Sequence, residues 1–375
     1  DRRLGPTVLA AIKNEIGSPF PPLPNMSKNS STEQKPGFKV VDKKEHKASL
    51  RNLLSAREAK CPIHSNPSPA HHRSDTSNRS EIDVKNAIFG SVSKRFTCTC
   101  VWKRQLVEPL DGFVLSNVLS KEECEKLRKG VATDGQDYTF WNPEDTNSKH
   151  TRNVDTIEVF DESLAAGIWE RVKMQVTNNI EIPEENDDWE FGLEGKWEAY
   201  GINPKMLFAR YPEGGHFSPH TDGHQVIDFN HRSLHSVIIY LNDCSEGGAT
   251  QLFKPEDYKD KKFIQDKQGR FRFSKEKVAD RALPKAGSML SFSQHHMHEG
   301  EPVGSGCSKF IIRTDVMYRR VPAVCDKPND VEAYQCYQAA MEAEANAEHD
   351  KAGHLYTKVG RLSEKLARML NIWMG

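Results

Sequence analysis

The spacing of apolar positions changes from helical to strand-like along the chain. Near residue 106 a short apolar strand is followed by Ser120 and, three positions later, by Glu123, a pair that forms a capping box at the start of a helix. In residues 161–176 apolar side chains recur every three or four positions, which predicts a second helix. Two helices are therefore expected before the first long strand.

From about residue 196 the pattern becomes that of short strands separated by Gly, Pro and Asp turns. The β-rich runs are KWEAYGINPKMLFARY, SLHSVIIYLND, ATQLFKP, GSMLSFSQ and KFIIRTDVMYRR. Helices followed by many strands predict a mainly β fold with flanking helices, in which an antiparallel sandwich or barrel is buttressed by the helices.

The two ends of the chain differ from this middle part. Residues 1–105 are rich in Pro, Ser and Asn and too polar to bury a face, so we expect a largely disordered or loosely docked arm. Within it, PTVLAAIKNEI and KASLRNLLSARE are candidates for transient helices. Residues 106–322 form the expected central domain, and residues 323–375 a helical extension.

One apolar stripe runs along the end of that extension and either packs back onto the domain or binds a partner helix. Its members are Leu362, Leu366, Met369 and Trp373. The stripe leaves the oligomeric state open.

Charge and cysteine content narrow the class of protein. With 52 basic and 53 acidic residues the net charge is −1, so no overall field favours nucleic acid or a membrane surface. Neither a basic groove with interleaved aromatic residues nor an apolar run of the about 20 residues that span a membrane is present in the sequence. The 8 cysteines include no C-x-x-C pair, which is typical of reduced thiols in an intracellular, here cytoplasmic, protein.

Two short Cys motifs and the first residue of the chain bear on metal binding and on cellular location. The pairs Cys98/Cys100 and Cys61/His64 each supply fewer than the four ligands of a structural zinc site, so neither predicts one. Because the chain begins with Asp rather than Met, a targeting segment could precede it.

The stretch YPEGGHFSPHTDGH contains His220 and Asp222, two positions apart. On an extended segment such side chains point to the same face and can bind one ion together. A further ligand is available among His295, His296 and His298 in SQHHMHEGEPV. Two imidazoles and one carboxylate leave three positions of an octahedral ion open, as in the facial triad of non-haem Fe(II) oxygenases, whereas a lone His-x-Asp also occurs in polar turns.

Six motifs follow one another in the second half of the chain. They are RYPEGGHFSPHTDG, SVIIYLND, GGATQLF, GSMLSF, HEGEPV and GCSKFIIRTDVMY. In this order they resemble the 2-oxoglutarate- and Fe(II)-dependent dioxygenases, most closely the prolyl 4-hydroxylase-like branch. The resemblance covers residues 110–320 loosely and 207–318 closely, and it implies a double-stranded β-helix (jelly-roll) core with the metal at one mouth.

The resemblance also implies a ligand set and cofactors. The third ligand is assigned to His298 rather than to His295 or His296, because only His298 is followed by Glu-Gly-Glu-Pro-Val. His220, Asp222 and His298 are then the catalytic metal ligands. Fe(II), 2-oxoglutarate as co-substrate and O2 are implied, with ascorbate as a reductant.

The distal carboxylate of 2-oxoglutarate needs a cation, and two basic residues share one face of the strand KFIIRTDVMYRR. Members of the family place this cation at the position of Lys309 or at that of Arg313. Because Arg grips a carboxylate with two parallel hydrogen bonds, we expect Arg313 as the principal anchor, with Lys309 beside it or replacing it. The alternative for Arg313 is a salt bridge to Asp315. The resemblance places three more residues in this pocket: Tyr211, Tyr240 and Thr250.

The expected activity is hydroxylation of a C–H bond, with release of succinate and CO2, on a peptidyl residue such as proline or on a small metabolite. Halogenating relatives lack the carboxylate, so an intact Asp222 favours hydroxylation or demethylation. A cupin-like metalloenzyme that does not use 2-oxoglutarate and a catalytically inactive binding module are the alternatives. The cations at positions 309 and 313 argue against the first, and the complete ligand set argues against the second.

Residues 137–156, polar and aromatic, form either a lid or substrate rim or a plain surface loop.

Overall fold

A computed structural model describes residues 101–132, 137–143, 146–184, 189–258 and 263–372. The two candidate transient helices of the N-terminal arm and the Cys61/His64 and Cys98/Cys100 pairs lie outside the described residues. No helix among the described residues combines the length and the apolar character that crossing a membrane requires.

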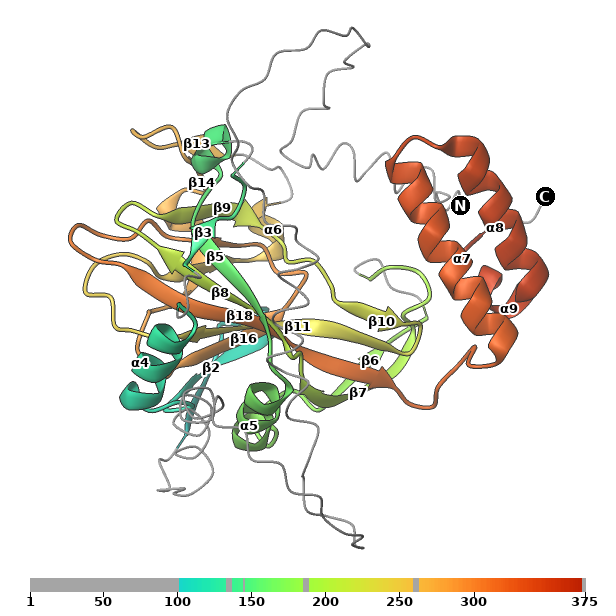
Figure 1. The fold of residues 1–375 in the computed structure, drawn as a ribbon, viewed down its shortest axis with the longest axis horizontal. Helices are drawn as coiled ribbons and strands as arrows, with labels where there is room; N and C mark the ends of the chain where they lie inside the picture. Colours follow the sequence, from blue (N-terminus) through green and yellow to red (C-terminus); the bar gives the residue numbers. More distant parts are fainter. Residues whose placement is uncertain (1–100, 133–136, 144–145, 185–188, 259–262, 373–375) are drawn as a thin grey trace, which may run out of the picture.

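Two antiparallel sheets face one another (Figure 1). The strands of the larger sheet are β1 (Trp102–Gln105), β2 (Gly112–Ser116), β3 (Thr139–Phe140), β5 (Asp155–Phe160), β6 (Asn179–Ile182), β7 (Gly195–Ile202), β8 (Lys205–Tyr211), β10 (Val226–Asp228), β11 (His231–Tyr240), β16 (Met289–Ser293) and β18 (Lys309–Arg320). Its order is β1-β2-β16-β11-β18-β8-β5-β3, with β10 beside β11, β7 beside β18 and β6 beside β7.

The smaller sheet has the order β15-β12-β17-β9-β4. Its strands are β4 (Arg152–Asn153), β9 (His216–His220), β12 (Thr250–Phe253), β15 (Val278–Ala282) and β17 (His298–Gly300), and a separate hairpin is formed by β13 (Ile264–Gln265) and β14 (Phe271–Arg272). From β8 onward the chain passes repeatedly between the two sheets, so that β8, β18, β11 and β16 oppose β9, β17, β12 and β15. This is the double-stranded β-helix, and it confirms the predicted fold class.

Helices cover the outer face of the larger sheet. They are α4 (Lys121–Gly130) and α5 (Glu162–Val172), and the short helices η1 (Thr146–His150), α6 (Pro255–Tyr258) and η2 (Lys275–Lys277) lie in connections. The predicted capping box at α4 is confirmed, because the Glu123 backbone N–H donates to Ser120 Oγ and the Ser120 N–H donates to the Glu123 carboxylate. Asp161 caps α5 by accepting from the Leu164 N–H at 3.0 Å.

Strand β18 shows how the alternation of side chains separates the core from the cavity. Ile312 and Val316 are fully buried in the apolar cluster between the larger sheet and the helices. Lys309, Arg313 and Asp315 have the opposite parity and line a cavity between the two sheets. The polar residues of this strand are therefore directed into the barrel by the same register that buries its apolar residues.

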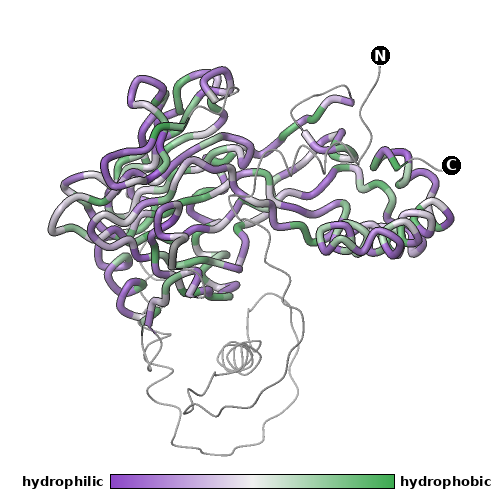
Figure 2. Tube along the Cα trace, turned by 90° about the horizontal axis from the view of Figure 1, so that it is seen from above, coloured by the Kyte–Doolittle hydropathy of each residue, from purple (hydrophilic) through white to green (hydrophobic). Residues whose placement is uncertain are grey.

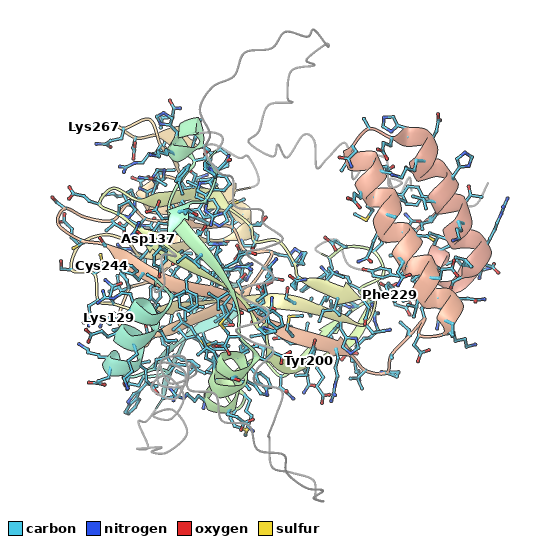
Figure 3. The ribbon with its side chains drawn as sticks, viewed as in Figure 1. Lys129, Asp137, Tyr200, Phe229, Cys244 and Lys267 are labelled. Atoms are coloured by element: carbon cyan, nitrogen blue, oxygen red, sulfur yellow. The ribbon has the colours of Figure 1, made fainter. Side chains whose placement is uncertain are left out.

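The C-terminal segment forms three helices, α7 (Pro328–Ala345), α8 (His349–Leu362) and α9 (Glu364–Met369), beyond one end of the strands (Figures 1 and 2). Phe229, in the turn between β10 and β11, belongs to the apolar cluster of these helices, and Figure 3 shows it at the end of the sheet that faces them. The helices thus pack against the domain. The predicted single stripe is interrupted at Ser363, whose hydroxyl caps α9 by accepting from the Leu366 N–H at 3.1 Å. Trp373 lies outside the described residues.

The larger sheet begins before the predicted domain boundary at residue 106. Trp102–Gln105 forms β1 and pairs with β2 from Trp102↔Ser116 onward. All four residues of β1 are exposed, so the pattern of apolar positions contained no signal for this strand. The run expected after residue 196 is likewise two strands, β7 and β8, because the chain turns between them.

Gly287, just before β16, provides a test of this packing. Its φ is +78°, and a Cβ there would lie 1.9 Å from the backbone oxygen of Leu119. We expect Gly287→Ala to lower the free energy of unfolding by about 2–4 kcal/mol, because both the backbone conformation and the contact forbid a side chain. Chemical denaturation measures this. Gly201→Ala is the matched control, because no atom lies within 4 Å of its Cβ position; equal losses in the two variants would contradict the account.

Candidate active site

A cavity of about 480 Å3 lies between the two sheets. Strands β8, β9, β11, β12, β17 and β18 contribute to its wall, and so does the short edge strand β4. Of the sequence-predicted site residues, seven line it: Tyr211, His220, Asp222, Thr250, His298, Lys309 and Arg313. The structure thus brings together residues that are up to 102 positions apart in the sequence, from Tyr211 to Arg313.

Three of these residues form a cluster of metal-ligand type. His220 and His298 are register partners on the antiparallel strands β9 and β17, and Asp222 follows β9 directly. One ligand atom from each of the three residues lies within 4.8 Å of the other two. Asp222 lies between the imidazoles, with Oδ1 3.8 Å from Nε2 of His220 and Oδ2 3.7 Å from Nε2 of His298.

Backbone carbonyls fix the tautomer of both imidazoles. Nδ1 of His220 lies 2.8 Å from the Ser218 oxygen, and Nδ1 of His298 lies 3.0 Å from the His296 oxygen. Because a carbonyl oxygen only accepts, each Nδ1 carries the hydrogen and each Nε2 keeps its lone pair directed into the cluster. Burial lowers the pKa of His220 to about 3 and also lowers the pKa of His298, so both rings are neutral at pH 7.

The carboxylate of Asp222 is kept ionised. Burial by itself would raise its pKa, but the charge of the Arg313 guanidinium outweighs burial and holds the pKa well below the usual range. The Ser236 hydroxyl donates to Oδ2 of Asp222 at 2.5 Å. Two neutral imidazoles and one carboxylate on one side of a point are a donor set that fits a divalent ion such as Fe(II) and leaves further coordination positions open.

Arg313 lies between two carboxylates. Its Nη1 is 3.0 Å from Oδ1 of Asp315, and its Nη2 is 3.6 Å from Oδ2 of Asp222. The salt bridge to Asp315 that the sequence left as an alternative is therefore present. Arg313 also donates to the Gly223 oxygen at 3.3 Å.

Lys309 occupies a different part of the cavity, 2% exposed and away from the metal-ligand cluster. Its Nζ donates to the Gly248 oxygen at 2.9 Å and lies 4.2 Å from the centroid of the Tyr211 ring. No carboxylate of the described residues forms an ion pair with it. Burial outweighs the nearby Cys244 and Glu301 and lowers the pKa of Lys309 to about 8.

Of the three further residues expected around this cation, Tyr211 and Thr250 line the cavity, and Tyr240 does not. Tyr240 is fully buried behind the wall, where its hydroxyl donates to Thr250 Oγ1 at 2.7 Å. The hydroxyl of Tyr240 therefore contacts a residue of the cavity lining, Thr250, and Tyr240 does not line the cavity itself.

The remaining histidines near the cluster have other partners. His216 is buried, and its Nε2 lies 3.0 Å from the His150 oxygen. His224 lines the cavity, and its Nδ1 lies 2.8 Å from Oε1 of Gln294. The ring of His295 contacts Trp189, and Nε2 of His296 accepts the Asp111 N–H at 2.8 Å.

Two residues of the cavity wall escaped the sequence analysis. The ring of Phe217 stacks on His220, with centroids 3.5 Å apart. Arg152, on β4, lines the cavity and belongs to the stretch 137–156 for which a substrate rim was one of two hypotheses. Phe217 could have been noticed by its closeness to His220 in the sequence, whereas nothing in a polar loop distinguished Arg152 from other arginines.

With this geometry in place, comparison with known proteins gives the class. Residues 206–314 match the family model of the 2OG-Fe(II) oxygenase superfamily, a span that includes the three residues of the cluster and the two cavity-lining cations Lys309 and Arg313. The match confirms the resemblance seen in the motifs: this part of the chain is similar to the 2-oxoglutarate- and Fe(II)-dependent dioxygenases. The superfamily implies Fe(II), 2-oxoglutarate and O2. No curated protein matches the chain in sequence.

Solved structures similar to the chain include prolyl hydroxylases. A Pseudomonas putida prolyl-4-hydroxylase has 15% identity over 56% of this chain and 94% of its own, with a TM-score of 0.36. The viral collagen prolyl hydroxylase of Paramecium Bursaria Chlorella virus-1 has 16% identity over 55% and 94%, with a TM-score of 0.31. A Trichoplax adhaerens prolyl hydroxylase, in complex with a hypoxia inducible factor peptide fragment, has 15% identity over 56% and 84%, with a TM-score of 0.36.

The ligand cluster predicts a specific pattern of metal binding. We expect chelator-treated protein to bind one Mn(II) or Co(II), and His298→Ala to weaken this binding by about 100-fold or more, because two ligands remain where three converge. Isothermal titration calorimetry measures the affinity. His295→Ala, which removes a nearby imidazole outside the cluster, should bind like the wild type. Equal weakening in both variants, or unchanged affinity in His298→Ala, would contradict the assignment.

Proposed function

We propose that this cavity is the active site of a hydroxylase in which His220, Asp222 and His298 bind Fe(II). The observation that carries the proposal is the convergence of two neutral Nε2 atoms and one ionised carboxylate within 4.8 Å of one another. A set of this kind has an affinity for Fe(II) but leaves positions for 2-oxoglutarate and O2. Because all three ligand groups are in place, the geometry does not favour an inactive binding module.

We further propose Lys309, rather than Arg313, as the principal anchor for the distal carboxylate of 2-oxoglutarate. Arg313 already lies between the carboxylates of Asp222 and Asp315. Lys309 is a buried cation that forms no ion pair with the described residues, and its ammonium donates to a carbonyl and lies over an aromatic ring. An incoming carboxylate gains most from the cation whose charge is least compensated. This reverses the order of preference expected from the sequence, and Arg313 becomes a residue that keeps Asp222 ionised.

Tyr211 and Thr250 line the cavity where Lys309 lies, and both are proposed to contact the same carboxylate. Tyr211 is the register partner of Lys309 on β8, which places the two side chains beside each other. The hydroxyl of Tyr240 orients Thr250 from behind. Lys309 therefore supplies charge, and the two other residues supply shape and hydrogen-bonding groups.

The metal and 2-oxoglutarate, when bound, supply the oxidative chemistry that hydroxylates a C–H bond and releases succinate and CO2. The chain holds their ligands in place: Ser218 and His296 orient the imidazoles through their backbone oxygens, and Ser236 orients the carboxylate. We include in the proposal a peptidyl residue such as proline, or a small metabolite, as the C–H donor and ascorbate as reductant.

None of the described cysteines forms a disulfide, which supports the intracellular, cytoplasmic location proposed from composition.

Release of succinate from 2-oxoglutarate tests the function without a known substrate. Purified protein with Fe(II) and O2 is expected to convert 2-oxoglutarate slowly to succinate, and Asp222→Ala is expected to reduce the rate by about 100-fold or more, because it removes one of three metal ligands. The variant Glu158→Gln at the rim is the control. Wild-type protein that neither releases succinate nor binds 2-oxoglutarate would rule out the proposal.

Lys309 predicts a pH dependence of co-substrate affinity. Its ammonium is charged below a pKa of about 8 and neutral above it, so the affinity for the 2-oxoglutarate dianion should fall as the pH rises through 8. We expect Lys309→Met to raise the KM for 2-oxoglutarate by about 30-fold or more at pH 7. Lys309→Arg should keep the charge and remove the fall above pH 8, since Arg does not titrate there. A larger rise in KM for Arg313→Met than for Lys309→Met would instead identify Arg313 as the anchor.

A further inference from the structure

Arg152 is a second cation in the cavity wall that forms no ion pair with the described residues, although the charge of Asp222 acts on it. It lies on β4, the edge strand of the smaller sheet, where it pairs with Phe217 of β9. Its Nε is buried without a hydrogen-bond partner, and no carboxylate of the described residues forms an ion pair with it. A guanidinium in this position is unusual, because Arg is almost always paired when it is removed from water.

Two aromatic rings surround the guanidinium instead. Its central carbon lies 5.0 Å from the Trp141 ring centroid and 4.5 Å from that of Phe217. Contacts of a cation with aromatic faces offset only part of the cost of burial. Burial accordingly lowers the pKa of Arg152, although an arginine remains charged at any physiological pH.

The other cations of the cavity are accounted for. Arg313 lies between Asp222 and Asp315, and Lys205 at the rim lies 3.6 Å from Glu158. Under the proposed function, Lys309 receives the distal carboxylate of 2-oxoglutarate and the metal receives the other one. With metal and co-substrate in place, Arg152 is a cation of the cavity lining that still has no ion-pair partner among the described residues.

The position of Arg152 relates it to the reacting centre. Phe217, on β9, lies beside the guanidinium of Arg152 on the neighbouring strand β4. The ring of Phe217 also stacks on the metal-ligand candidate His220, with ring centroids 3.5 Å apart. Phe217 therefore contacts both the guanidinium and a residue of the ligand cluster. A substrate that binds Arg152 through one group would therefore have the rest of its structure in the same cavity as the metal-ligand cluster.

We propose that Arg152 determines specificity by binding a carboxylate of the primary substrate, with Trp141 and Phe217 as the apolar walls of that subsite. The inference rests on the proposed function, since it assigns the two carboxylates of 2-oxoglutarate elsewhere. It defines the substrate class as carboxylate-bearing molecules, whether organic acids, amino acids or acidic peptide side chains. Arg suits this role because its planar fork accepts a carboxylate through two parallel hydrogen bonds.

Acetate and its neutral analogue acetamide test the subsite without knowledge of the substrate. The protein is loaded with Zn(II) in place of Fe(II) and saturated with 2-oxoglutarate, and binding of each probe is followed by saturation-transfer NMR. We expect acetate to bind and acetamide not to bind. Arg152→Gln should weaken acetate binding by about tenfold or more, and Arg152→Lys should restore part of it, because the charge returns without the fork.

A matched control and a second titration separate the possible results. Lys205→Gln, which removes a paired cation at the rim of the same cavity, should bind acetate like the wild type. Failure of acetate to bind the saturated wild type, or equal binding by Arg152→Gln, would overturn the proposal. So would a comparable loss of 2-oxoglutarate affinity in Arg152→Gln, which would assign the arginine to the co-substrate. Failure of the wild type to bind 2-oxoglutarate at all is a different result and counts against the proposed function itself.

Discussion

The antiparallel pairing of β9 with β17 is the constraint on which the site depends. It makes His220 and His298 register partners although 77 residues separate them in the chain, and a register shift follows between His298 and Gly300, where the partner of Gly300 is Phe217. A bulge of this kind re-aims side chains at the rim of a barrel. The backbone thereby directs two imidazoles, and the carboxylate that follows β9, toward one point. The rest of the barrel holds this pair of strands in place.

Charge in the cavity is arranged around that point. Arg313 is placed between the carboxylates of Asp222 and Asp315, where it favours ionisation of the first. Lys309 and Arg152 lie on other parts of the wall and have no carboxylate partner among the described residues. Uncompensated buried cations cost stability unless an anion is supplied. A site with one such cation for the distal carboxylate of 2-oxoglutarate and another for a carboxylate of the substrate is therefore suited to binding two different acids at once.

The features of the fold and site that depend on residues close together in the chain could be predicted from the sequence. The capping box at Ser120, the period-two pattern of KFIIRTDVMYRR and the spacing around His220 each depend on neighbours in the chain, and the structure contains the predicted helix, strand and cluster. The rest depends on contacts across the barrel. Arg313 was preferred as the anchor because the sequence does not show that Asp222 lies beside it. The sequence also does not show that Thr250, and not Tyr240, lines the cavity. Arg152 comes from an edge strand of two residues, too short for any periodicity.

A crystal structure of the protein with Mn(II) and 2-oxoglutarate, obtained without O2, tests the central claim most directly. The account predicts anomalous density for one ion bound by Nε2 of His220, Nε2 of His298 and a carboxylate oxygen of Asp222. It also predicts the distal carboxylate of 2-oxoglutarate at Nζ of Lys309. An ion bound elsewhere, or a distal carboxylate bound at Arg313 or Arg152, would contradict it.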